Sequence, residues 1–177
     1  ALAAGASGTR PVVLVVASSR EAEETVETIR SWYSGDPNDV AQLEAWETLP
    51  HERLSPRADT VASRMAVFRR LKHPQEGSKL FGPIRILGMP VRSLIQPVVA
   101  GLADVEPLVF SQGEELALDE TSRRLVENAY TRVDLVMDRG EFAVRGGIID
   151  VFPPTLPHPV RIEFFGDEID TIREFHA

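Results

Sequence analysis

The sequence contains no cysteine, which excludes disulfide bonds and thiolate metal ligands and is compatible with a reducing compartment. It also lacks a long apolar segment, since runs such as residues 11–17 are far shorter than the ~20 residues that cross a bilayer. Residues 1–8 lack the basic start of a signal peptide and are typical of the interior of a larger protein. We therefore expect a cytoplasmic protein without membrane contact.

Catalytic and nucleotide-binding motifs are missing as well. A phosphate-binding loop requires GxxxxGK[ST] between a strand and a helix, whereas the glycine-rich residues 5–10 lack the lysine and lead into a strand. No histidine has a partner at the spacing of a zinc site; the four are His51, His73, His158 and His176. We expect no catalytic residue, no metal and no cofactor in this chain.

Charge is distributed unevenly along the sequence. Residues 1–103 hold 12 Lys+Arg and 11 Asp+Glu, a net charge of +1, whereas residues 104–177 hold 7 and 16, a net charge of −9. An acidic domain binds nucleic acid poorly, because affinity for phosphates grows with the number of cations presented. We therefore expect a protein partner for the second half and no strong binding of DNA, with its few arginines acting as determinants of specificity.

The patterning predicts two domains of different architecture. Residues 11–17 form a continuous β-branched run, which is typical of a strand buried on both faces of a parallel sheet. Helical spacing then alternates with short apolar runs, which predicts an α/β domain over residues 1–103. Its expected helices cover residues 19–34 and 59–71, the second facing inward through Val61, Met65, Phe68 and Leu71, and its further strands cover 40–44 and 84–89. Short alternating runs after residue 104 predict a small α+β domain with an antiparallel sheet over residues 104–177.

Residues 139–175 carry the pattern that bears most on function. In the stretch VRIEFF, residues 160–165, alternation places Phe164 on the apolar face and Phe165 on the opposite face, beside Arg161 and Glu163. A large aromatic side chain among charges, just before a turn, is typical of a docking surface. We expect Phe165, rather than Phe164, to point at a partner.

Two further arginines are expected on the same face. Alternation places Arg132 and Arg145 at outward positions of neighbouring strands, with Val133, Leu135 and Met137 facing inward before a hairpin turn at residues 138–140. Arginines and exposed aromatics are enriched among interface hot spots. The alternative is that the arginines form ordinary surface pairs with Glu141, Glu163 and Asp134, while Phe165 packs under a loop or another domain.

Two long motifs also carry a family resemblance. The motifs RGEFAVRGGIIDVFPP, residues 139–154, and RIEFFGDEIDTIREF, residues 161–175, closely resemble the bacterial transcription-repair coupling factors (Mfd), in the part related to the excision-repair protein UvrB. Three upstream motifs are also similar to that family: WETLPHERLSP at residues 46–56, RMAVFRR at 64–70 and PVRSLIQPV at 90–98. The resemblance covers essentially the whole chain.

The resemblance implies a degenerate P-loop-like domain without ATPase activity, followed by a small domain that recruits UvrA, the damage-recognition ATPase. It implies UvrA contacts at Arg132, Arg145, Arg161, Glu163, Phe164 and Phe165. In an intact protein the module would couple stalled RNA polymerase to nucleotide excision repair. The ATP- and Mg²⁺-dependent DNA motor would lie outside this chain.

A fragment of UvrB, or of a related ATP-dependent DNA-melting enzyme, is the alternative. Against it, the tyrosine-rich DNA hairpin of UvrB is absent where residues 46–56 stand. The sequence also departs from the UvrB pattern FRVRG, because Ala143 stands where UvrB has a further arginine. We therefore expect a reduced or shifted set of UvrA contacts.

Overall fold

The computed structural model describes residues 10–48, 56–78 and 81–176. The glycine-rich residues 5–10 and the motif at residues 46–56 lie largely outside this range. The chain divides into two compact units, Ala1–Val105 and Glu106–Ala177. The division therefore falls after residue 105, where the sequence placed it after residue 103.

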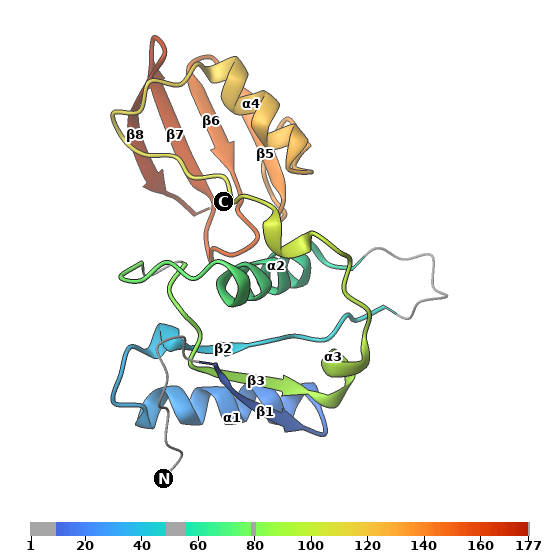
Figure 1. Cartoon of the computed structure of the whole chain (residues 1–177). Coiled ribbons are helices and arrows are strands. Elements are labelled where there is room, and N and C mark those ends of the chain that lie inside the picture. The colour runs from blue at the N-terminus through green and yellow to red at the C-terminus, as the bar shows by residue number, and fades with distance from the viewer. Residues whose placement is uncertain (1–9, 49–55, 79–80, 177) are drawn as a thin grey trace. The chain divides into compact units, whose positions relative to one another are not determined.

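The first unit is a parallel sheet between helices (Figure 1). Its three strands, in the order β1-β3-β2, are β1 (Val12–Val16), β2 (Val40–Gln42) and β3 (Ile86–Pro90). Helix α1 (Ser19–Trp32) begins where the Ser18 side chain accepts a hydrogen bond from the Glu21 amide. Helices α2 (Ala58–Lys72) and α3 (Val91–Ile95) follow, with the 3-10 turns η1 (Pro37–Asp39) and η2 (Leu102–Asp104). The mixture of parallel strands and helices confirms the expected α/β class.

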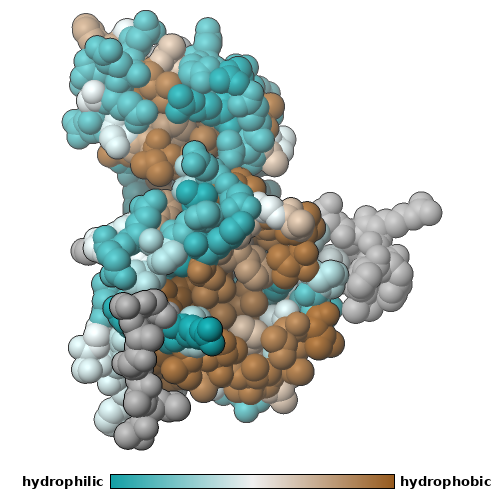
Figure 2. Space-filling model, viewed as in Figure 1, coloured by the Kyte–Doolittle hydropathy of each residue, from teal (hydrophilic) through white to brown (hydrophobic). Residues whose placement is uncertain are grey.

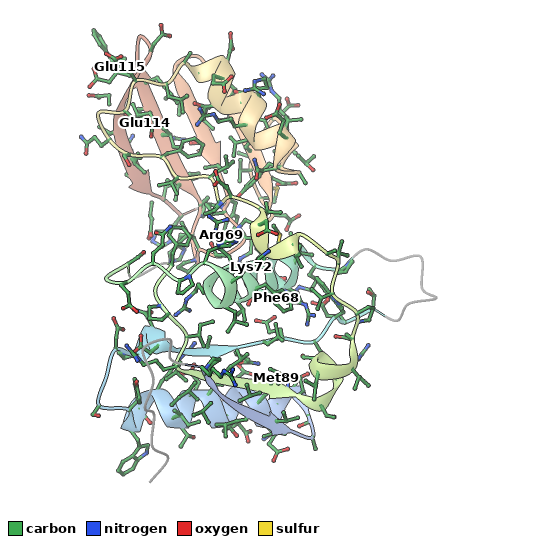
Figure 3. The ribbon with its side chains drawn as sticks, in the orientation of Figure 1. Phe68, Arg69, Lys72, Met89, Glu114 and Glu115 are labelled. Atoms are coloured by element: carbon green, nitrogen blue, oxygen red, sulfur yellow. The ribbon has the colours of Figure 1, made fainter. Side chains whose placement is uncertain are left out.

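Helices α1 and α2 cover opposite faces of this sheet. Val26 of α1 packs against Gly88, where an added Cβ would lie 2.4 Å from the Val26 Cγ2 atom. The neighbouring positions Leu87 and Met89 point to the other face, where they join Val67 of α2 in a buried cluster. On its outer side, α2 contacts the η2 turn: Lys72 donates to the Asp104 carboxylate, and Arg69 donates to the Val105 carbonyl. Figure 3 labels Arg69, Lys72 and Met89.

Two predictions for this unit are wrong. Strand β1 is not buried on both faces: it lies at the edge of the sheet, and Val12, Val13 and Val15 are exposed. Figure 2 shows a broad apolar surface on this unit. Leu94 and Ile95 of α3 are also exposed.

The second wrong prediction concerns the buried face of α2, which consists of Thr60, Arg64 and Val67. Of the residues predicted one position later, Phe68 does pack against the buried cluster, whereas Leu71 is exposed. The reason is tertiary contact. The buried Arg64 guanidinium lies 4.3 Å from the Trp46 ring centroid and bonds to the Glu44 carbonyl. The Thr60 hydroxyl bonds to the Glu47 carboxylate. The segment that follows β2 therefore covers the polar side chains of α2 and buries them.

The second unit is a five-stranded sheet with one helix. The strands lie in the order β4-β5-β6-β7-β8: β4 (Thr131–Arg132), β5 (Glu141–Arg145), β6 (Ile148–Val151), β7 (Val160–Phe165) and β8 (Glu168–Glu174). The expected antiparallel sheet is in fact mixed, because β4 pairs with β5 in parallel. Helix α4 (Leu118–Glu127) contributes Leu125 to a core with Phe142, Ile149 and Ile162.

The edge of β8 is occupied by an earlier part of the chain. The Gly113 amide donates to the Ile169 carbonyl, and the Ile169 amide donates to the Glu114 carbonyl. Glu115 forms a bridge with Glu168, and Figure 3 labels Glu114 and Glu115 in this segment. The beginning of the β8 edge, around Glu168 and Ile169, is therefore shielded from pairing with another chain. Among the described residues, no helix is long and apolar enough to span a lipid bilayer.

Candidate protein-binding site

The sheet of the second unit presents one face to α4 and the other away from it. Along β7, Val160, Ile162 and Phe164 belong to the α4 side and contact the core, whereas Arg161 alternates with them. The register aligns Arg161 with Asp150 of β6 and with Arg173 of β8. We call this second side, with Ala143, Asp150 and Arg161 at its centre, the arginine face.

Phe165 is the most exposed aromatic side chain of this region. Its exposed fraction is 84%, whereas Phe164 is partly buried and packs against the core cluster. The pairing of β7 with β8 contains a β-bulge: Glu163 pairs with Thr171 and the next residue, Phe164, pairs with Ile169, so Asp170 is the extra residue. Because the extra residue lies in β8, the alternation of side chains along β7 is not interrupted. The prediction that Phe165 is exposed and Phe164 packs inward is confirmed.

Arg161 is held in place by Asp150. The Arg161 Nε and Nη2 atoms lie 2.6 and 2.8 Å from the two carboxylate oxygens of Asp150, which is only 5% exposed. The Phe175 ring stacks on the guanidinium, with 5.1 Å between the guanidinium carbon and the ring centroid. The hydrogen bond to Asp150 raises the pKa of Arg161. The guanidinium is therefore oriented before any partner arrives.

Glu163 and Arg145 are also engaged within the chain. The Glu163 carboxylate forms an ion pair with Arg173, and Arg145 Nη2 donates to the Asp134 carbonyl at 2.6 Å. The alternative expectation of surface pairing is thus partly realised, although the partners differ from those proposed. Arg161 pairs with Asp150, which was not among the acidic residues named, and Arg145 binds the backbone oxygen of Asp134 instead of its carboxylate.

Arg132 does not join the arginine face. Strand β4 runs parallel to β5 and pairs Arg132 with Phe142, and adjacent residues of parallel strands project to the same face. Register therefore places Arg132 on the α4 side. Arg132 is exposed, and its side chain makes no hydrogen bond or ion pair within the described part of the chain. The structure brings together Arg145, Arg161, Glu163 and Phe165, and leaves Arg132 apart.

The segment between β4 and β5 also differs from the prediction. It forms no hairpin, and Val136 is buried while Leu135 and Met137 are exposed. The Glu141 carboxylate accepts hydrogen bonds from the Met137 and Asp138 amides, which lowers its pKa. These bonds hold the segment as a loop, which explains why alternation within an extended strand failed here.

Several residues of this face escaped the sequence analysis: Asp150, Arg173 and Phe175. Asp150 could have been found, since the stretch IIDV alternates so that Asp150 lies opposite to Ile149 and Val151. In an antiparallel sheet it then falls on the same side as Arg161. Arg173 depended on the register shift at Asp170, and Phe175 lies beyond the end of β8, so alternation alone could not place them.

A small cavity lies in the first unit. It measures about 130 Å³ and is lined by Asp36, Asn38, Arg70 and Arg85, among others. Small-molecule sites usually enclose ~300–1,000 Å³. The Arg70 guanidinium there donates through Nε to the Gly82 carbonyl and through Nη2 to the carbonyls of Asn38 and Pro83. In the described residues, no group of His, Asp or Glu is arranged to hold a metal ion.

Comparison with known proteins gives a consistent assignment. Residues 108–177 match the family model described as the UvrB interaction domain. The chain is 51% identical over 165 residues to the transcription-repair-coupling factor of Mycobacterium tuberculosis (strain CDC 1551 / Oshkosh), a match that covers 93% of this chain and 13% of that protein. Its counterpart in Escherichia coli (strain K12) is 36% identical over 137 residues, covering 77% of this chain and 11% of the relative.

A second kind of relative matches a shorter part of the chain. UvrABC system protein B of Listeria monocytogenes (serotype 4b) is 47% identical over 66 residues, which is 37% of this chain and 10% of that protein. The chain thus spans about 13% of the length of the first curated relatives that it matches. Similarity to both kinds of protein is what the two long motifs predicted.

Proposed function

Because this chain belongs to the transcription-repair-coupling factor family, we propose that it is a protein-recruitment module that binds UvrA. In the intact protein it would couple stalled RNA polymerase on DNA to nucleotide excision repair, in the cytoplasm. The match of residues 108–177 to the UvrB interaction domain supports this proposal. So does the similarity to UvrABC system protein B, since a shared partner is a reason for two repair proteins to share a domain.

One observation carries the proposal: Phe165 is 84% exposed at the end of β7, on the same face as the oriented Arg161. A phenylalanine exposed to this extent contributes little to folding, yet its burial against a partner is worth roughly 1.5–3 kcal/mol. An aromatic beside an arginine is the composition typical of a hot spot. The arginine face therefore has the properties of a contact surface.

We assign roles to the six proposed contact residues from their geometry. Phe165 would enter a pocket of UvrA, while Arg161 would present its remaining N–H groups to an acceptor. Arg145 and Glu163 would act at the border of the contact, because both are already engaged within the chain. Phe164 would support Phe165 from the core, and Arg132 would contact UvrA only if the interface extends past the β4 edge.

We infer a domain organisation in which the first unit, predicted as residues 1–103, is a degenerate nucleotide-binding domain and the second, predicted as residues 104–177, is the UvrA-binding domain; the structural division falls two residues later, after Val105. In this proposal ATP and Mg²⁺ serve a motor elsewhere in the protein. A second candidate, a fragment of an ATP-dependent enzyme related to UvrB, is favoured by the similarity to UvrABC system protein B. A titration of the chain with ATP separates the two, because measurable affinity would favour the enzyme.

Binding of UvrA by the 177-residue chain, measured by calorimetry or pull-down, tests the proposal. Phe165→Ala is the primary variant, and we expect it to weaken binding by about 1–3 kcal/mol without loss of folding. Arg161→Ala should weaken binding similarly, but it leaves Asp150 buried without a partner, so Asp150→Ala/Arg161→Ala serves beside it. Val126→Ala, at an exposed position of α4, is the matched control. Unchanged affinity of correctly folded Phe165→Ala and Arg161→Ala would refute the assignment.

A further inference from the structure

The loop between β4 and β5 displays two large apolar side chains. Leu135 is 60% exposed and Met137 is 70% exposed, while Val136 between them is only 2% exposed. Single exposed apolar residues are common and need no explanation. Here, however, the exposed residues flank a buried anchor, and the loop that carries them is fixed.

The anchoring contacts show where this loop lies. Glu141 and Arg145 project from β5 on the same side, since they are four residues apart in a strand. Glu141 accepts from the Met137 and Asp138 amides, both at 2.9 Å, and Arg145 donates to the Asp134 carbonyl at 2.6 Å. Two side chains of one strand face therefore hold both ends of the loop.

Ala143 gives independent evidence for this placement. It lies between Glu141 and Arg145 on the arginine face of β5, and it is fully buried although α4 covers the opposite face. A small side chain flanked by the two anchors is buried because the loop passes over it, and Val136 is the loop residue buried in turn. Leu135 and Met137 must then project away from the sheet.

We propose that Leu135 and Met137 form a second, apolar contact element of the recruiting surface, beside Phe165 and Arg161. This inference rests on the proposed function and deepens it. Strand β5, under the loop, and strand β7, which carries Phe165, are separated by one strand, and hence by roughly 10 Å. That separation fits easily within the ~800 Å² that each partner contributes to a standard interface.

The chemistry of this contact element predicts the kind of surface that the partner must present. The partner must offer an apolar patch for Leu135 and Met137, bordered by carboxylates that can approach Arg161 and Arg173. Because Glu141 and Arg145 fix the loop in advance, binding costs little ordering of this segment.

The test measures binding of UvrA to the full 177-residue chain and to Leu135→Ala/Met137→Ala. We expect roughly tenfold weaker binding or more, with unchanged circular dichroism, because both side chains are exposed in the free chain. Val126→Ala, 56% exposed on α4, is the matched control and should bind normally. A conservative Met137→Leu variant should retain most of the affinity, since it keeps the apolar contact.

A second variant tests the role of the anchors. Glu141→Ala keeps both apolar side chains but removes the acceptor for the Met137 and Asp138 amides. Faster hydrogen exchange at these two amides together with weaker UvrA binding would support a preorganised element. Full affinity of Leu135→Ala/Met137→Ala, alongside lost affinity of Phe165→Ala, would overturn this inference and leave the proposed function standing. No binding of UvrA by the wild-type chain would overturn both.

Discussion

The ion pair between Asp150 and Arg161 gives the sharpest quantitative prediction. Its perturbation is Asp150→Ala, which removes a carboxylate that is 5% exposed and accepts two hydrogen bonds, at 2.6 and 2.8 Å. Removing one partner of a fully buried pair costs ~3–5 kcal/mol, because the other charge stays trapped away from water. The Arg161 side chain is 31% exposed, so water still reaches the guanidinium after the carboxylate is removed. The contact of the guanidinium with the Phe175 ring is also retained. We therefore expect a smaller loss, about 2 kcal/mol.

The reverse substitution should be more damaging. Arg161→Ala leaves the Asp150 carboxylate, whose side chain is only 7% exposed, without its cation. A buried unpaired carboxylate costs more than a partly hydrated guanidinium, so we expect about 3 kcal/mol for this variant. The double variant removes both charges and should be less destabilised than the sum of the single variants, by about 2 kcal/mol.

The assay must report on the second unit alone. Both tryptophans, Trp32 and Trp46, lie in the first unit, so their fluorescence follows that unit and serves as an internal control. Native-state hydrogen exchange of β6 and β7 amides reports the opening free energy of the second unit. A loss below about 0.5 kcal/mol for Asp150→Ala, or an absence of coupling in the double-variant cycle, would refute the view that this pair orders the arginine face.

Two further predictions address other parts of the chain. Hydrogen bonds from the Asp138 and Met137 amides lower the pKa of Glu141. The stability that the Glu141 carboxylate contributes is therefore fully present above the ordinary pKa of 4.5 and is lost as the pH falls through the lower pKa of the folded state. The amide chemical shifts of the loop should change with pH over this range, and the Glu141→Gln variant should not show that change. Gly88→Ala should destabilise the first unit by about 1–3 kcal/mol, because the new methyl group would lie 2.4 Å from the Val26 Cγ2 atom. Urea unfolding followed by tryptophan fluorescence measures this loss. A wild-type unfolding midpoint, or an added Val26→Ala that restores none of the lost stability, would contradict this packing.

How far the sequence determined the fold depended on where each segment buries its side chains. Strands and helices with one apolar face were predicted well: β7 alternates as expected, and α1 covers Ser19–Trp32 where a helix over residues 19–34 was expected. The register of α2 was wrong by one position, because Arg64 is buried under Trp46, a contact between residues 18 positions apart. No local pattern marks an arginine for burial. Similarly, the exposure of β1 follows from its position at the sheet edge, which strand composition does not reveal.

The candidate site was predictable in composition but not in its connections. Alternation identified Arg161, Glu163 and Phe165 as neighbours, and the structure places them on one face. It failed for Leu135 and Met137, because the loop is held by side chains of a later strand, Glu141 and Arg145. A period of two holds only inside a ladder, and here the ladder ends after the two residues of β4. The sequence therefore identified the residues of the arginine face, whereas the exposure of Leu135 and Met137 could be seen only in the structure.

Internal pairing of the arginines does not remove them from recognition. Arg161 uses Nε and Nη2 on Asp150, which leaves Nη1 and the second Nη2 proton for a partner, in an orientation fixed by the carboxylate and by Phe175. A free surface arginine would lose side-chain entropy on binding, at about 0.5–1.5 kcal/mol, whereas a side chain already ordered loses less. In a domain with a net charge of −9 by the count above, long-range attraction cannot favour an acidic partner. Affinity must then come from contacts made at short range, which is the contribution that fixed arginines, Phe165 and a pinned apolar loop can make.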